Sequence, residues 1–334
     1  MLSYSIVIRT LGKAGEKYQA LLDSISAQTI KPLNVYVFIP PQYDLPKEQL
    51  GWEKFIRTPK GMLRQRIDGL LYAQNNDEAD VILAVDDDVA FPQDYAEKSL
   101  SLISKYDADI LMPSVWTKGQ IKARVVKPWS KTDIFTMLTG ARTERRNSPF
   151  RISILPTAGF AANSALEGVY PTQSVHFTAF WMKNSLISDL RFDDEYWIEK
   201  SGYSLPDDQV FGYKCHINGL KVLGTNKVYH RHLDAGSANP NGIKNSMYAQ
   251  GRNYLIFWHR FLWKTSKGLI RRSVLLTGIS YRLLANALFY SIRKLKKDTA
   301  TPPLSVYVSG VCDAIKYLRS EEYKNLSSPL IKRD

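Results

Sequence analysis

Five apolar residues, Val81-Ile82-Leu83-Ala84-Val85, run directly into three carboxylates, Asp86-Asp87-Asp88. A run of this kind predicts a buried strand, and open α/β sheets bind ligands at the carboxyl ends of their strands. Because side chains alternate along a strand, we expect Asp86 and Asp88 to point the same way and to repel each other unless a cation lies between them. Carboxylate oxygens suit a hard divalent ion, whose remaining ligands are usually substrate phosphates. The stretch therefore indicates metal-assisted chemistry on a phosphorylated substrate.

The composition limits the class of protein. The 334 residues are 44% hydrophobic, enough for one large or two modest domains, and the formal net charge of +13 favours anionic partners. Two cysteines, Cys215 and Cys312, make neither a disulfide framework nor a zinc pattern. We find no signature of nucleic-acid binding, and no N-terminal signal precedes the strand-like residues that begin at Tyr4. A cytoplasmic protein that does not bind nucleic acid is the expectation.

The first part of the chain alternates between strand and helix patterns. We expect strands at 4–9, 34–39, 55–57, 80–85 and 108–115, with helices at 15–28 and 62–74. Further strands are expected at 152–155, 176–182 and 221–230, and a helix at 206–217. This alternation predicts an α/β fold with a mostly parallel central sheet flanked by helices. The basic segment 117–151 is either a solvated surface excursion or a flap that faces substrate or membrane.

The chain after residue 243 has a helical pattern. Residues 273–292 are broadly apolar but include Arg282 and Asn286. A central arginine costs about 2.5–3.5 kcal/mol in a spanning helix, so we do not expect this helix to cross a membrane. Basic residues flank it on both sides, which favours an amphipathic helix lying on an anionic membrane surface. Packing of this helix against the α/β domain is an equally good interpretation.

Two further groups of polar residues follow the aspartates. Asp207-Asp208 comes directly after Pro206 at an expected helix start, where acidic residues are commonly no more than dipole partners or caps. Farther along, an expected strand ends in His230-Arg231-His232. The chain order is therefore carboxylates at a strand end, an acidic helix start, and histidines at a strand end.

This order resembles the inverting glycosyltransferases of family 2, which have the GT-A fold. Further segments similar to the family's motifs are Ile6-Val7-Ile8-Arg9-Thr10, Lys60-Gly61-Met62-Leu63-Arg64-Gln65-Arg66, Leu205-Pro206-Asp207-Asp208-Gln209, Val228-Tyr229-His230 and Gln250-Gly251-Arg252-Asn253-Tyr254. The last of these is similar to a helix start in members that build polysaccharides on lipid carriers. One segment departs from the family: Ile39-Pro40-Pro41-Gln42 stands where an acid normally helps to read the nucleotide base.

The resemblance implies a role for each group of residues. Asp88, Asp86 and His230 would bind Mn²⁺ or Mg²⁺, with His232 as the alternative histidine. Thr10, Arg66, Asp86 and Asp87 would bind a sugar carried on a nucleoside diphosphate. Asp208 would be the general base that activates an acceptor hydroxyl, and Asp207 would contact the acceptor. Trp181 is a candidate for stacking on an acceptor sugar, although an aromatic residue at this place is more often ordinary strand core.

Together these expectations define one hypothesis and two alternatives. The hypothesis is a metal-dependent inverting glycosyltransferase that acts on a glycan or lipid-linked glycan at the cytoplasmic face of a membrane. Residues 1–240 would form the catalytic domain, with a donor half at 1–116 and an acceptor half at 152–240, and residues 241–334 would form a helical extension. The alternatives are a phosphatase of the haloacid-dehalogenase type, and a non-catalytic module that binds sugar nucleotides or nucleic acid.

Overall fold

The computed structural model describes residues 2–117, 152, 168–233, 241–295 and 301–331. The strands, in chain order, are β1 (Tyr4–Arg9), β2 (Val35–Ile39), β3 (Lys54–Arg57), β4 (Val81–Asp86), β5 (Val89–Ala90), β6 (Ile110–Thr117), β7 (Val169–Pro171), β8 (Ala179–Lys183) and β9 (Val222–His232). The α-helices are α1 (Glu16–Ser26), α2 (Met62–Asn76), α3 (Tyr95–Tyr106), α5 (Asp207–Ile217), α6 (Gly242–Phe257), α7 (Leu269–Leu295), α8 (Leu304–Arg319) and α9 (Glu321–Lys324). Short helical segments are η1 (Asn184–Leu186), η2 (Ser188–Leu190), η3 (Phe192–Ser201) and the π-helical η4 (Trp258–Trp263).

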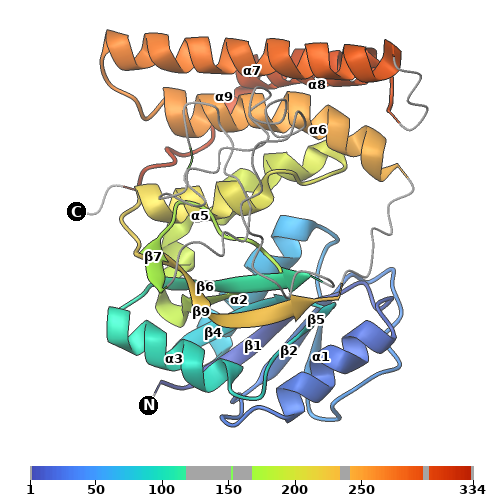
Figure 1. Ribbon diagram of the computed structural model, residues 1–334, viewed down its shortest axis with the longest axis vertical. Coiled ribbons are helices and arrows are strands. Elements are labelled where there is room, and N and C mark those ends of the chain that lie inside the picture. Colours follow the sequence, from blue (N-terminus) through green and yellow to red (C-terminus); the bar gives the residue numbers. More distant parts are fainter. Residues whose placement is uncertain (1, 118–151, 153–167, 234–240, 296–300, 332–334) are drawn as a thin grey trace, which may run out of the picture.

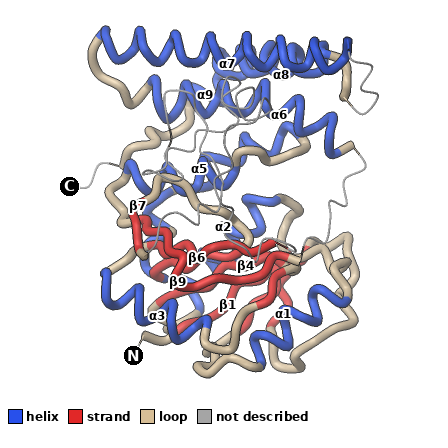
Figure 2. The backbone as a smooth tube through the Cα atoms, in the orientation of Figure 1, coloured by secondary structure: helices blue, strands red, loops and turns tan. Residues whose placement is uncertain are grey.

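Nine strands of the described chain form one mixed sheet. Its order is β3-β2-β1-β4-β8-β6-β9-β5, with β7 paired to β9. The strands from β3 to β4 are parallel, as are β6 and β9, whereas β8 is antiparallel to both of its neighbours. The expected α/β fold with a central sheet and a helical C-terminal part is confirmed (Figure 2). Four of the eight strand pairings among the described residues are parallel and four are antiparallel, so the sheet is mixed and not mostly parallel as expected.

Alternation along the strands sorts the helices onto the two faces of the sheet. Ile82 and Ala84 of β4 belong to the same hydrophobic cluster as α2 and α5, whereas Val81, Leu83 and Val85 pack in the cluster that contains α1 and α3. Asp86 continues the first series and therefore faces α2. Helix α2 lies directly against β1, because a Cβ on Gly69 would come within 2.3 Å of the Val7 side chain.

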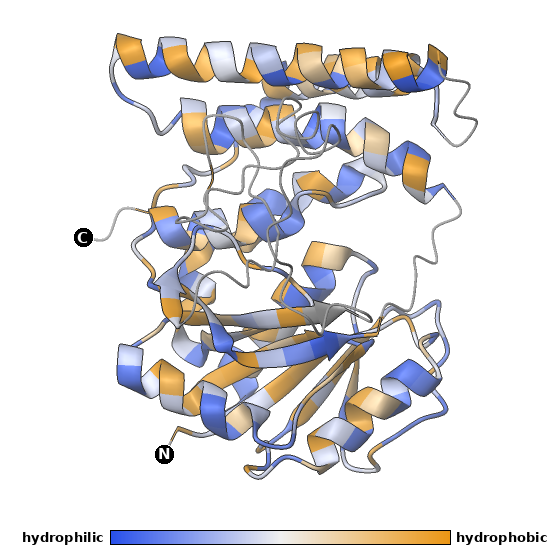
Figure 3. Ribbon diagram, viewed as in Figure 1, coloured by the Kyte–Doolittle hydropathy of each residue, from blue (hydrophilic) through white to orange (hydrophobic). Residues whose placement is uncertain are grey.

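The C-terminal helices form layers beyond α5 on the α2 face of the sheet. Helix α6 contributes to the same hydrophobic cluster as α2 and α5, and α7 lies outermost (Figure 1). Helices α6 and α8 cross closely, since a Cβ on Gly251 would lie 2.4 Å from the Tyr307 carbonyl oxygen. Hydrophilic and hydrophobic residues alternate along the ribbon of α7 (Figure 3). None of the described helices is both long enough and apolar enough to cross a bilayer.

Candidate active site

The aspartate at the end of β4 meets two arginines. Asp86 Oδ1 accepts hydrogen bonds from Arg9 Nε at 3.1 Å and Nη2 at 2.9 Å, and from Arg66 Nη2 at 2.5 Å. Arg9 ends β1, which lies beside β4, and Arg66 lies in the first half of α2. Strand order reverses at β1, whose neighbours are β2 and β4, so this cluster occupies the kind of crevice where α/β sheets bind ligands.

Arg66 is a buried cation. Its side chain is 2% exposed, its Nη2 also donates to the Phe177 carbonyl oxygen at 2.8 Å, and its guanidinium carbon lies 3.9 Å from the centre of the Phe177 ring. Burial lowers the pKa of Arg66 to about 10, against the attraction of Asp86, so the side chain is still charged at neutral pH. It therefore supplies a fixed positive charge at the strand end.

Asp87 turns toward β1 rather than toward Asp86. Thr10 Oγ1 donates to Asp87 Oδ2 at 2.5 Å and accepts from the Gly12 amide at 2.8 Å. Burial raises the pKa of Asp87 to about 6, although the bond from Thr10 opposes the shift. Asp87 thus holds the loop after β1 in place. Thr10 and Asp87, both expected to bind the donor, are in contact with each other.

Asp86 and Asp88 have different partners. Strand β4 ends at Asp86, and Asp87 and Asp88 form a turn, so the strand alternation expected for Asp86 and Asp88 stops there. Asp88 Oδ2 lies 3.2 Å from Nε2 of His232, the histidine expected to bind metal if His230 does not. The pairing of β5 with β9, which sets Val89 opposite His232, brings this pair together.

His230 is fully buried in a chain of hydrogen bonds. Its Nε2 lies 2.9 Å from Thr178 Oγ1, which lies 3.0 Å from His176 Nδ1, and His176 Nε2 lies 2.7 Å from the Pro113 carbonyl oxygen. A carbonyl only accepts, so with both rings neutral His176 donates from Nε2, Thr178 donates to His176, and His230 donates from Nε2. Burial lowers the pKa of both histidines.

This hydrogen-bond chain leaves a lone pair on the Nδ1 atom of His230. That atom is buried and has no hydrogen-bond partner among the described residues. A neutral imidazole nitrogen with an unshared lone pair is a metal ligand. However, the residues that the structure describes contain no group of three or more His, Cys, Asp or Glu side chains arranged to hold a metal ion. The groups here that could bind a cation are the Asp88–His232 pair and the Nδ1 atom of His230.

The second acidic pair lies near the same arginines. Asp207 and Asp208 begin α5, and Asp207 is 8% exposed. Burial raises the pKa of Asp207 to about 6, and the positive charges of Arg66 and Arg9 oppose this shift. Burial and the neighbouring Asp207 raise the pKa of Asp208 well above its usual range. Arg66 therefore hydrogen-bonds to Asp86 and acts electrostatically on Asp207 and Asp208, so the two acidic groups lie in the field of the same cation.

Helix α6 holds the loop that leads to these acids. Asn253 Nδ2 donates to the carbonyl oxygens of Ile198 at 3.0 Å and Leu205 at 2.9 Å, and to Ser201 Oγ at 2.9 Å. Asn253 is fully buried, so its amide replaces the water that these backbone groups would otherwise need. Asn253 belongs to segment 250–254, which was expected at a helix start but lies inside α6, because that helix already begins at Gly242. Here Asn253 orders the loop before α5.

One expected acceptor residue has a different role. Trp181 is fully buried in β8. Its ring centre lies 5.2 Å from that of Tyr4, in the hydrophobic cluster that contains α1 and α3. No face of the ring is open to an acceptor sugar, so the stacking prediction for Trp181 is wrong and the ordinary interpretation as strand core is correct. The basic segment 118–151 lies outside the described residues.

Sequence reasoning missed two residues that shape the site. Arg9 contacts Asp86; it stands in a segment similar to a family motif, but neither that motif nor its place at a strand end assigned it a partner. Glu199 Oε1 accepts from the backbone amides of Leu63 at 2.8 Å and Arg64 at 2.9 Å and so caps α2 from a distant part of the chain. A cap supplied over this sequence distance leaves no local pattern.

Comparisons with known proteins find similarity in solved structures. No family model matches the chain, and no curated protein matches it in sequence. The fold is similar to S. aureus TarS residues 1–349 in complex with UDP, with a TM-score of 0.44, 14% identity and coverage of 97% of this chain and 91% of that one. It is also similar to the mannosyltransferase PcManGT from Pyrobaculum calidifontis in complex with GDP-Man and Mn²⁺, with a TM-score of 0.47, 14% identity and coverage of 98% and 84%. A third is GalNAc-T7 with UDP, GalNAc and Mn²⁺, with a TM-score of 0.47, 12% identity and coverage of 95% and 57%.

Proposed function

We propose that this protein is a metal-dependent inverting glycosyltransferase of the GT-A type that moves a sugar from a nucleoside diphosphate to a hydroxyl of a glycan or lipid-linked glycan. The observation that carries the proposal is that one buried cation, Arg66, hydrogen-bonds to Asp86 at the end of β4 and acts electrostatically on Asp207 and Asp208 at the start of α5. The acids at the end of β4 can help to bind the leaving diphosphate, and the acids at the start of α5 can activate the incoming hydroxyl. The resemblance to family 2 supports the same assignment.

The donor would lie at the carboxyl ends of β1 and β4. Arg66 and Arg9 hold positive charge beside Asp86, and Thr10 and Asp87 fix the adjoining loop. Mn²⁺, or Mg²⁺ as the second choice, would be held by Asp88 and by His232, which lies 3.2 Å from it. The resemblance to family 2 adds Asp86 and His230 as the further ligands. When bound, such an ion neutralises the charge that develops on a diphosphate leaving group. Fixed positive charges at the same edge act in the same direction.

Asp208 is the proposed general base. A carboxylate is ordinarily too weak a base for a sugar hydroxyl. Burial and the neighbouring Asp207 raise the pKa of Asp208, which makes it a stronger base. Deprotonation would come late, as the new bond to the anomeric carbon forms. A single displacement with the base on the face opposite the leaving group inverts that centre. Asp207 would orient the acceptor.

The experiment is a screen of sugar nucleotides for Mn²⁺-dependent hydrolysis and transfer. Asp88→Ala should lose metal-dependent donor binding, whereas Asp208→Asn should bind the donor normally and lose transfer. The exposed Asp193→Ala is a matched control that should change neither. Normal transfer by Asp208→Asn would refute the base assignment, and donor turnover that ignores Mn²⁺ would refute the metal.

The outer face of α7 supports the proposed contact with an anionic membrane. Ile270 is 84% exposed, Leu284 72% and Leu288 60%, and exposed cations lie near both ends of the helix at Arg271 and Lys294. Apolar residues that enter the interface, together with cations that meet lipid phosphates, are the features of a helix that lies on a bilayer. Such contact would place the enzyme at the cytoplasmic face of a membrane.

Vesicle flotation tests this contact. Leu284→Glu should abolish binding to vesicles that contain phosphatidylglycerol, and the wild type should not bind pure phosphatidylcholine vesicles. Leu33→Glu is the control, since Leu33 is 54% exposed and lies between α1 and β2. If Leu284→Glu instead changes only the oligomeric state, the face is an interface between copies of the chain and the membrane proposal fails.

A further inference from the structure

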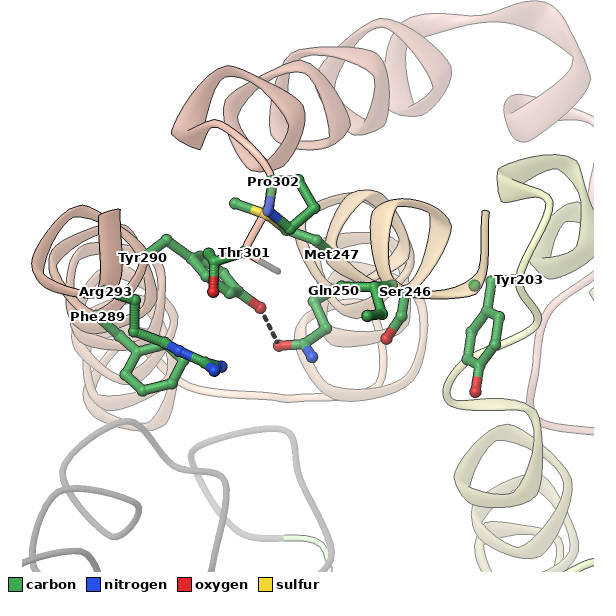
Figure 4. A pocket seen from close by; sticks show the side chains of 11 residues that line it. Tyr203, Ser246, Met247, Gln250, Phe289, Tyr290, Arg293, Thr301 and Pro302 are labelled. Atoms are coloured by element: carbon green, nitrogen blue, oxygen red, sulfur yellow. Dashed lines mark hydrogen bonds between the residues drawn. The ribbon is translucent and has the colours of Figure 1, made fainter. Parts of the chain in front are cut away.

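A pocket of about 570 Å³ opens between α6, α7 and the start of the segment that leads to α8 (Figure 4). Its volume lies within the range of small-molecule sites. The residues that matter for its chemistry are Tyr203, Ser246, Gln250, Phe289, Tyr290 and Arg293. No residue of the proposed donor site lines it.

The pocket is continuous with the loop that carries the proposed base. Tyr203 lies at one side of the pocket, five positions before Asp208. Burial, and after it the charges of Asp207 and Asp208, raises the pKa of the Tyr203 hydroxyl. Asn253, which holds this loop, lies three residues after Gln250 on α6. Residues three apart share a helix face, so one face of α6 both orders the loop and lines the pocket.

The lining combines apolar rings, neutral donors and one cation. Tyr290 donates its hydroxyl to Gln250 Oε1 at 3.0 Å, which leaves the Gln250 amide nitrogen as the group that can donate to a ligand (Figure 4). Arg293 is the one charged side chain among the described residues that line the pocket, and its guanidinium carbon lies 5.5 Å from the centre of the Phe289 ring. Guanidinium groups match phosphate oxygens, and aromatic faces suit the C–H faces of sugars.

We propose that this pocket binds a phosphorylated sugar of the acceptor, with the phosphate at Arg293 and the sugar ring against Phe289 and toward Tyr203. The proposal rests on the proposed function, because it assigns to the same reaction the site where the acceptor is held. The hydroxyl to be glycosylated would extend past Tyr203 toward Asp208.

The test is binding of α-D-glucose 1-phosphate and of inorganic phosphate, measured by calorimetry on the full chain. Arg293→Gln should weaken binding of both probes by about tenfold or more, because it removes the charge-assisted bonds. Lys294→Gln removes the adjacent charge, which does not line the pocket, and should leave both affinities unchanged. Phe289→Leu should weaken glucose 1-phosphate by a few fold, about the worth of one aromatic contact, and leave inorganic phosphate unchanged.

A phosphorylated sugar can be free or attached to a lipid, and a second probe distinguishes these sources. An octyl phosphodiester of glucose should bind more tightly than glucose 1-phosphate if the acceptor is lipid-linked, and no more tightly if it is free. Arg293 dependence with either probe supports the proposal. Equal losses in Arg293→Gln and Lys294→Gln, or no binding of either probe, overturn it. Because the probes should bind Asp88→Ala normally, a failure of the proposed metal site would not be mistaken for a failure of this pocket.

Discussion

Replacing Asp207 by asparagine should stabilise the protein at neutral pH while impairing its activity. The pKa of Asp207 is raised from 3.8 to about 6, a net value that already includes the attraction of Arg66 and Arg9. Each pKa unit corresponds to about 1.36 kcal/mol, so the ionised carboxylate lowers the free energy of unfolding by about 3 kcal/mol. An amide of the same shape carries no charge and avoids this cost.

The pH dependence fixes the sign of the effect. Between pH 3.8 and about 6 the folded state binds more protons at Asp207 than the unfolded state does, so the free energy of unfolding falls as pH rises through this window. Above the window the full cost is present, and below it the carboxyl group is neutral in both states. Asp207→Asn should therefore gain about 3 kcal/mol at pH 8 and almost nothing near pH 4.

Urea unfolding followed by circular dichroism at the two pH values measures this difference. The exposed Asp193→Asn is the control and should stay within about 0.5 kcal/mol of the wild type at both. The same variant of Asp207 should transfer sugar more slowly, which is the usual relation between stability and a charged functional site. An equal gain at both pH values, or a loss at pH 8, would refute the argument from burial.

Three other substitutions test separate parts of the site. Asp208→Asn should lower the transfer rate on the order of 10²–10⁴-fold. The wild-type rate should rise with pH, because burial raises the pKa of this base. If the transfer rate of the variant rises equally with pH, Asp208 is not the base. Arg66→Gln should weaken nucleoside diphosphate binding by about tenfold or more in a fluorescence titration, since it removes the buried charge beside Asp86; unchanged affinity would exclude Arg66 from the donor site. Glu199→Ala should lower the free energy of unfolding by about 1–2 kcal/mol in urea, because two amides at the start of α2 lose their acceptor, and an unaltered midpoint would show that water replaces it.

The elements that sequence reasoning located are those with a strong local signal. The apolar run before Asp86 predicted β4, and a proline followed by two acids predicted the start of α5 at Asp207. The alternation of β4 also explains why Asp86 faces α2, because it continues the series of Ile82 and Ala84. In each case the pattern and the structural feature lie within a few residues of each other.

The features that sequence reasoning missed depend on contacts between distant parts of the chain. The cap that Glu199 places on α2 and the pairing of β5 with β9 both join segments more than a hundred residues apart. Periodicity carries no information about such partners. Trp181 shows the same limit, since an aromatic residue in a strand can stack on a ligand or fill the core, and only the packing of β8 between β4 and β6 decides between them.

Electron paramagnetic resonance of Mn²⁺ tests the central claim most directly, because it reports free and bound ion separately. With UDP or GDP present, the wild type should bind Mn²⁺, Asp88→Ala should bind it about tenfold or more weakly, and Asp193→Ala should match the wild type. Equal Mn²⁺ binding by the wild type and Asp88→Ala, or no binding by the wild type with either nucleotide, would contradict the proposed site at the end of β4.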